Sequence, residues 1–171
     1  MRGMKDYILD LNNEFLSIAE KLGYSELAAA KQIDVSKFNT KIKLVCSKKI
    51  FKSDIKKDRG LIESKKADII YGFETLSRKD GFHFLNSGLN QVLAKLMKDR
   101  NVSYGISFSQ LLNASKQEQS VMFGRIMQNL KLCKKYKVHV IAASFARNPY
   151  EMRDSKDMQA FARVLGLQGY K

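Results

Sequence analysis

Short apolar runs alternate with amphipathic stretches along the chain, and the apolar runs have the length of β-strands. The last of them, VHVIAAS, is apolar at consecutive positions, as in a strand covered on both faces by helices. One run, ELAAAK, is rich in alanine, which leaves its assignment as a strand open. The pattern predicts strands over residues 7–11, 26–31, 42–46, 67–72, 102–108 and 138–144.

Apolar residues at helical spacing predict helices over residues 13–23, 86–100 and 117–136, and a last helix that Ser155 caps and Gly166 closes. The last three of these helices have apolar stripes that are expected to face the core. The stripes comprise Leu89, Val92, Leu93, Leu96 and Met97; Phe123, Ile126, Met127, Leu130 and Cys133; and Met158, Phe161, Ala162 and Leu165.

Strands and helices in this order are typical of parallel βαβ units, arranged either as a doubly wound sheet or as a barrel. A full eight-unit barrel usually needs about 250 residues, so a barrel of 171 residues would be abbreviated. No linker composition interrupts the chain, which predicts a single domain over residues 1–171. In both architectures the loops after the strands carry function. Such loops are expected at 73–84, 109–116 and 145–155.

The charge of the chain indicates a polyanionic partner. Lysine and arginine number 31 against 17 acidic residues, a formal net charge of +14. Nucleic acid is the simplest such partner and a membrane surface the weaker one. No apolar stretch has the length of a membrane span, and the N-terminus lacks the apolar core of a signal peptide. Cys46 and Cys133 lie in apolar patterns and are interpreted as reduced core thiols, so a cytoplasmic protein is expected.

The basic residues form four groups: 41–59, 77–80, 124–137, and the three arginines Arg147, Arg153 and Arg163. Most single lysines belong to solvated faces. Arg78 and Arg147 each follow a predicted strand, and a guanidinium group fits phosphate oxygens and stacks on unpaired bases. Of the aromatic residues in the same loops, most are expected in the core.

The chemistry of a metal-dependent phosphoesterase is sparsely represented. Such an enzyme needs several His, Asp and Glu ligands, but the chain contains only His83 and His139. His139 lies within an apolar strand and is expected to be buried or half-buried, and packing is the favoured role of His83. No glycine-rich phosphate loop occurs. We therefore expect neither a self-sufficient active site nor a metal bound by this chain.

Three strings carry a resemblance to a known family: SGLNQVLAKL (87–96), GRIMQNLKLCKKYKVHVIAASFARNPYEMR (124–153) and SKDMQAFARVLGL (155–167). Over residues 67–167 the chain resembles the archaeal ribonuclease P protein component 3 family, the p30-type subunit. The segment DYILDLN resembles the first strand of that family.

The resemblance implies an abbreviated TIM-like (β/α) barrel related to the polymerase-and-histidinol-phosphatase (PHP) metalloenzymes, with parallel strands and outer helices. It implies an RNA-binding, non-catalytic subunit of the ribonuclease P endoribonuclease. The expected partners are the ribonuclease P RNA and a second small protein subunit, with precursor tRNA contacted indirectly and no membrane. In that enzyme the RNA, with magnesium, removes the 5′ leader from precursor tRNA, and no cofactor is expected on this chain.

The resemblance also places the RNA contacts on two segments, with no catalytic and no metal-binding residue. The first segment contributes Arg78, Lys79, Ser87 and Asn90, and the second contributes Arg147 and Arg153. Lys95, on the helix between them, is a further candidate.

The chain departs from the family pattern at several positions. Histidine stands at His139 and lysine at Lys156 where the family usually has proline. Many members have Ser-Gly-Ala where this chain has Ser144, Phe145 and Ala146, which predicts a bulkier loop and an altered RNA contact. The chain also stops soon after the last helix, which puts a closed eight-strand barrel in doubt. A stand-alone PHP-type phosphoesterase and a general RNA-binding protein remain alternatives.

Overall fold

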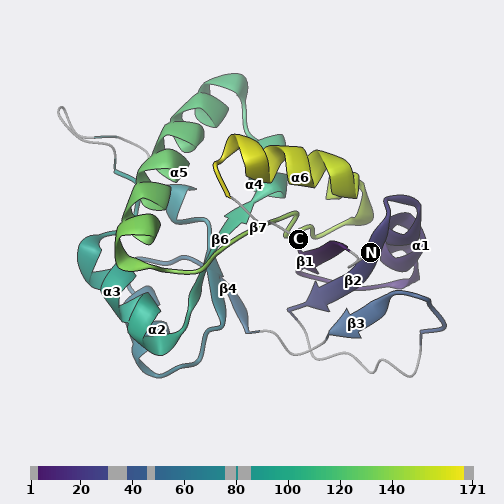
Figure 1. Cartoon of the computed structure of the whole chain (residues 1–171), viewed down its shortest axis with the longest axis horizontal. Helices are drawn as coiled ribbons and strands as arrows, with labels where there is room; N and C mark the ends of the chain where they lie inside the picture. The colour runs from purple at the N-terminus through teal and green to yellow at the C-terminus, as the bar shows by residue number, and fades with distance from the viewer. Residues whose placement is uncertain (1–3, 31–37, 46–48, 76–79, 81–85, 168–171) are drawn as a thin grey trace. The chain divides into compact units, whose positions relative to one another are not determined.

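The structure, a computed structural model, describes residues 4–30, 38–45, 49–75, 80 and 86–167. These residues fall into two compact units (Figure 1). The first unit combines residues up to 48 with those from 142 onward, and the second spans residues 49–141. Both units combine parallel strands with helices, so the chain has the predicted α/β class.

The first unit contains a three-stranded sheet in the order β1-β2-β3, in which both pairings are parallel. Its elements are β1 (Met4–Ile8), α1 (Asn13–Lys21), β2 (Tyr24–Ala29), β3 (Lys43–Val45) and α6 (Ser155–Val164). The Asn12 side chain caps α1 by accepting a hydrogen bond from the backbone of Phe15. Gly23, at φ +77°, then turns the chain into β2. Ile8, Phe15 and Leu27 lie at the centre of this unit's core.

The second unit contains a four-stranded sheet in the order β4-β5-β6-β7, with β4–β5 and β5–β6 parallel. Its elements are β4 (Ile50–Lys52), α2 (Asp58–Glu63), β5 (Ile69–Tyr71), α3 (Gln91–Arg100), β6 (Ser103–Ser107), α4 (Phe108–Leu112), α5 (Lys116–Tyr136) and β7 (Val140–Ala143), whose last two residues belong to the first unit. A capping box between Ser115 and Glu118 begins α5. The α5 helix packs against α3.

The structure contains every strand and long helix that the apolar pattern predicts, although several ends differ. β1 begins at Met4 rather than residue 7, and α3 begins at Gln91 rather than residue 86. Asp154, not Ser155, caps α6, because its side chain accepts the Lys156 N–H while Ser155 is the buried first residue of the helix.

Four expectations about burial are wrong. Val92 is 61% exposed and Met127 42% exposed, so neither belongs to the stripe assigned to it. His139 is exposed rather than buried, and its Nδ1 lies 3.1 Å from Ser103 Oγ. Phe145, predicted to enlarge a surface loop, is completely buried.

An isolated parallel bridge lies inside the first unit. Ala146, which follows β7, forms a parallel bridge with Ile8 at the end of β1, and the Leu9 N–H donates to the Ala146 carbonyl at 2.9 Å. In the described residues the strands form two open sheets, and no pairing closes either one into a barrel. Among the described helices, none is both long and apolar enough to span a bilayer.

Candidate RNA interface

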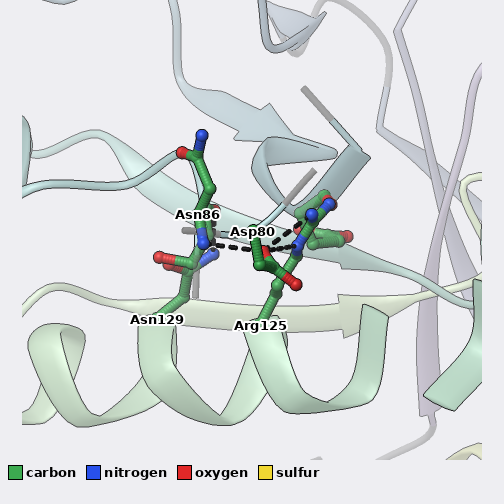
Figure 2. Close-up of polar contacts among 6 residues, drawn as sticks. Asp80, Asn86, Arg125 and Asn129 are labelled. Carbon is green, nitrogen blue, oxygen red and sulfur yellow. Dashed lines mark hydrogen bonds and ion pairs between the residues drawn. The ribbon is translucent and has the colours of Figure 1, made fainter. Parts of the chain in front are cut away.

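A buried arginine of α5 holds the segment that follows β5. The Arg125 guanidinium donates from Nη1 to the Glu74 carbonyl at 2.9 Å, and its Nε and Nη2 lie 2.9 and 2.8 Å from Asp80 Oδ1 (Figure 2). One side chain therefore fixes two points of this segment. Arg78 and Lys79 lie between these points in sequence and fall outside the described residues.

The far end of the same segment is held by a second polar residue of α5, one turn further on. The buried Asn129 donates from Nδ2 to the Ser87 carbonyl at 3.0 Å. The Asn86 N–H donates to Asp80 Oδ1 at 2.7 Å (Figure 2). That hydrogen bond and the Arg125 guanidinium hold the pKa of Asp80 below its usual value, so this carboxylate stays ionised and paired.

Glu74, whose backbone carbonyl accepts a hydrogen bond from Arg125, also has a buried carboxyl group. Glu74 is fully buried and its Oε2 accepts the Tyr104 hydroxyl at 3.0 Å, while Asn129 Nδ2 lies 3.4 Å from that hydroxyl. Burial raises the pKa of Glu74 to about 7, an effect that the hydrogen bonds and the charge of Lys52 only partly oppose. Within the described part of the chain, Glu74 Oε1 and Asn129 Oδ1 have no hydrogen-bond partner.

The predicted contact residues of this segment have different environments. The Ser87 side chain is buried, and the Ser87 carbonyl accepts the hydrogen bond from Asn129, so the structure gives this residue a structural role. Asn90 is exposed and caps α3 by accepting the Leu93 N–H at 2.9 Å. Lys95 is exposed on α3, with Nζ 5.8 Å from the centre of the Tyr136 ring. Contact of these residues with RNA stays a prediction.

The loop after β7 is also tied to a buried carboxyl group. Asp6 accepts hydrogen bonds from the Ser144 backbone at 2.8 Å, the Ser144 hydroxyl at 2.6 Å and the Tyr7 backbone at 2.9 Å. Burial raises the pKa of Asp6 to about 6 against these hydrogen bonds. Phe145 comes next at φ +46°, with its ring 6.2 Å from that of Tyr7. The ring thus packs inside the unit, and the loop surface is not enlarged by it.

The two arginines of this loop differ in exposure and in the hydrogen bonds of their side chains. Arg147 is exposed, and its backbone N–H donates to Glu151 Oε2 at 2.8 Å, which fixes the start of the loop. Arg153 is half-buried, and its Nη1 donates to the Tyr150 and Met152 carbonyls at 3.2 and 2.9 Å. The Arg147 guanidinium therefore has the more open position for a phosphate ligand.

A family model described as "RNase P subunit p30" matches residues 59–170. The chain belongs to this family. The chain is 37% identical over 83 residues to ribonuclease P protein component 3 of Methanosarcina mazei, and the match covers 48% of this chain and 35% of that protein. It is 33% identical over 111 residues to the component 3 protein of Methanocaldococcus jannaschii, which covers 65% of this chain and 45% of that one. The matches thus span less than half the length of these two relatives.

The chain also has the fold of a solved structure. A chain of the cryo-EM structure of archaeal ribonuclease P with mature tRNA matches 94% of it, and 82% of that chain is covered, with a TM-score of 0.70 and 21% sequence identity.

The predicted contact residues are divided between the two units. Ser87, Asn90 and Lys95 belong to the second unit, and Arg147 and Arg153 to the first. Sequence reasoning missed the buried polar groups that hold both segments, Arg125, Asn129, Glu74 and Asp6. For Asn129 the sequence did contain a signal, its helical spacing. Asn129 comes three residues after Ile126 and four before Cys133, which places it on the buried side of α5.

The other expectations about chemistry concern cysteine and metal ligands. Cys133 is buried, which raises the pKa of its thiol to about 12 and suppresses thiolate reactivity. Cys46 and His83 lie outside the described residues. In the part of the chain that the structure describes, no group of three or more His, Cys, Asp or Glu residues is arranged to hold a metal ion.

Proposed function

We propose that this p30-family chain is a non-catalytic, RNA-binding subunit of ribonuclease P. In that enzyme the RNA, with bound magnesium, removes the 5′ leader from precursor tRNA. The observation that carries the proposal is the anchoring of the segment after β5, where Arg125 and Asn129 hold Glu74, Asp80 and Ser87. This anchoring holds Glu74 and Asp80, which flank Arg78 and Lys79 in the sequence, against a helix, which suits a protein that positions RNA.

The buried polar groups support a structural role more than a catalytic one. Asp6 and Glu74 are enclosed and bonded to Ser144 and Tyr104, so neither carboxyl group is open to a substrate. The exposed basic residues, by contrast, are suited to phosphate oxygens. The proposed partners are the ribonuclease P RNA and a second small protein subunit, and precursor tRNA is reached through the RNA.

We further propose that both units belong to one subunit domain, an abbreviated TIM-like barrel of the PHP-related type. Support comes from the parallel pairings in both sheets and from the parallel bridge of Ala146 with Ile8. The match to a single chain of a solved archaeal ribonuclease P structure, over 94% of this chain and with a TM-score of 0.70, supports one subunit domain.

Replacing Arg147 with alanine should weaken RNA binding by about 1–2 kcal/mol and lower the salt dependence by about one ion. The exposed guanidinium is expected to neutralise one phosphate, while its removal leaves the backbone hydrogen bond to Glu151 intact. The measurement is a titration of the RNA at several salt concentrations. Arg163→Ala on α6 is the matched control, since it removes the same charge from another exposed position of the same unit. Equal losses in both variants would contradict the assignment of the loop.

The function is tested by recovering the tagged chain from its native cells, sequencing the bound RNA and identifying the bound proteins. Enrichment of ribonuclease P RNA with a small partner protein, and cleavage of precursor tRNA by the eluate, is the expected result. Enrichment of ribosomal or scattered RNA would instead favour a general RNA-binding protein. Metal-dependent phosphoesterase activity of the purified chain alone would favour the enzyme alternative.

A further inference from the structure

Four exposed lysines lie on the packed helix pair α3 and α5. Lys95 and Lys98 are three residues apart on α3, and Lys131 and Lys135 are four apart on α5, so each pair consists of neighbours on its own helix. All four side chains are exposed. The two helices pack against each other within the second unit (Figure 1). These four residues are called the lysine face below.

Tyr136 joins the two halves of the lysine face. The Nζ of Lys95 lies 5.8 Å and that of Lys135 5.5 Å from the centre of the Tyr136 ring. The Tyr136 hydroxyl donates to Gln91 Oε1 at 3.1 Å, which ties the end of α5 to the start of α3. Two ammonium groups from different helices therefore meet at one aromatic ring, a geometry that favours each cation.

The positive charge of the lysine face is uncompensated by ion pairs. Among the described residues, none of its four lysines pairs with a carboxylate, and Asp99, one turn after Lys95, forms no ion pair either. The sequence has no acidic residue between Arg125 and Lys137. Lysines near a helix C-terminus favour the helix dipole. That effect applies to Lys98 and Lys135 but leaves Lys131, and Lys95 in the middle of α3, unexplained.

We propose that the lysine face binds the phosphate backbone of RNA. The proposal rests on the RNA-binding function proposed above and extends the candidate interface beyond the loops. The extension is continuous, because Asn90 caps α3 and the next residue, Gln91, is bonded to Tyr136. Lysine ammonium groups contact phosphates as point charges, so this surface adds affinity and salt dependence without reading base sequence.

The test replaces Lys95 and Lys135 together with glutamine in the full chain and measures binding by fluorescence anisotropy. The probes are a 20-base-pair RNA duplex of arbitrary sequence and a 20-nucleotide oligo-uridine, each at several salt concentrations. We expect affinity to fall about tenfold and the salt slope to fall by about 1.8 for duplex or about 1.4 for single-stranded RNA. The probe with the larger loss identifies the form of RNA bound.

The matched control is Lys56→Gln with Lys66→Gln, which removes the same charge from two exposed lysines of the same unit outside the lysine face. We expect it to change affinity less than twofold. Equal losses in the two double variants, or no loss in Lys95→Gln/Lys135→Gln, would overturn the proposal while leaving the RNA-binding function standing. A wild-type chain that binds neither probe would overturn both. Loss of a copurifying protein with unchanged RNA affinity would assign the face to a protein partner instead.

Discussion

Replacing Arg125 with methionine should lower the free energy of unfolding by about 3 kcal/mol. Methionine preserves much of the apolar stem, but it leaves Asp80 and the Glu74 carbonyl without the donors that now reach them at 2.8–2.9 Å. Removing one partner of a buried pair is costly because the remaining charge is left uncompensated. The Asp80 side chain is 24% exposed and can recruit some water, so the lower end of the usual range is expected.

Urea unfolding of the wild type and the variant measures this loss. Arg59→Met is the matched control, because Arg59 pairs with Glu63 on the exposed surface of α2, where an ion pair contributes little, and should change stability far less. Hydrogen exchange adds a local readout, since the Asn86 N–H donates to Asp80 and should exchange faster once Asp80 loses Arg125. Similar losses of unfolding free energy in Arg125→Met and Arg59→Met, with unchanged hydrogen exchange at Asn86, would show that Arg125 does not hold the segment after β5.

Replacing Glu74 with glutamine should stabilise the protein at pH 8 by about 3 kcal/mol and remove part of its pH dependence. The pKa of Glu74 is about 7 in the folded protein, against 4.5 for an ordinary glutamate. Between these values the unfolded chain loses a proton that the folded protein keeps, so the stability of the wild type falls as pH rises. Above pH 7 both states are ionised and the full penalty of the buried charge remains. Glutamine is neutral throughout and lacks this penalty.

The measurement is the free energy of unfolding at intervals between pH 4 and pH 8. The charged and titratable groups around Glu74 are Lys52, Tyr104 and Arg125, and the variant retains all three. Asp6 also has a raised pKa, about 6, so some decline between pH 4 and 6 should persist in the variant. Most of the decline between pH 6 and 7 should disappear, leaving the smaller contribution of Asp6, which is half titrated at about pH 6. If the free energy of unfolding of the wild type did not change between pH 6 and 7, the raised pKa assigned to Glu74 would be contradicted.

Strands and long helices could be predicted because their signals are local. The missed strand β4 (Ile50–Lys52) has three residues, of which Phe51 and Lys52 are exposed, and it lies in a lysine-rich stretch that indicates a surface loop. The missed helices α2 and α4 have six and five residues, too few to show a helical period. Their positions depend on tertiary contacts that no short window of sequence contains.

The residues of the candidate site likewise divide into those with a local sequence signal and those that depend on distant contacts. Arg147 could be named from sequence because an arginine after a strand, in a loop with turn-forming residues, is itself the signal. Arg125 could not, since an isolated arginine on a helix indicates a solvated face, and its partners Glu74 and Asp80 are 51 and 45 residues away in the chain. The sequence therefore predicted the exposed charges, whereas the buried groups that position them required the structure.

Phe145 adopts a left-handed backbone, a conformation that favours glycine, at the position where the family pattern often has glycine. The strain of about 1–2 kcal/mol is offset by burial of the ring, worth about 2–3 kcal/mol. Packing beside Tyr7, rather than the freedom of glycine, thus sets the bend that precedes Arg147. Phenylalanine also leaves fewer backbone conformations open than glycine does. The backbone at the start of the loop after β7 is therefore preorganised: its conformational entropy is lost when the chain folds, so a ligand of this loop would not have to fix that bend again.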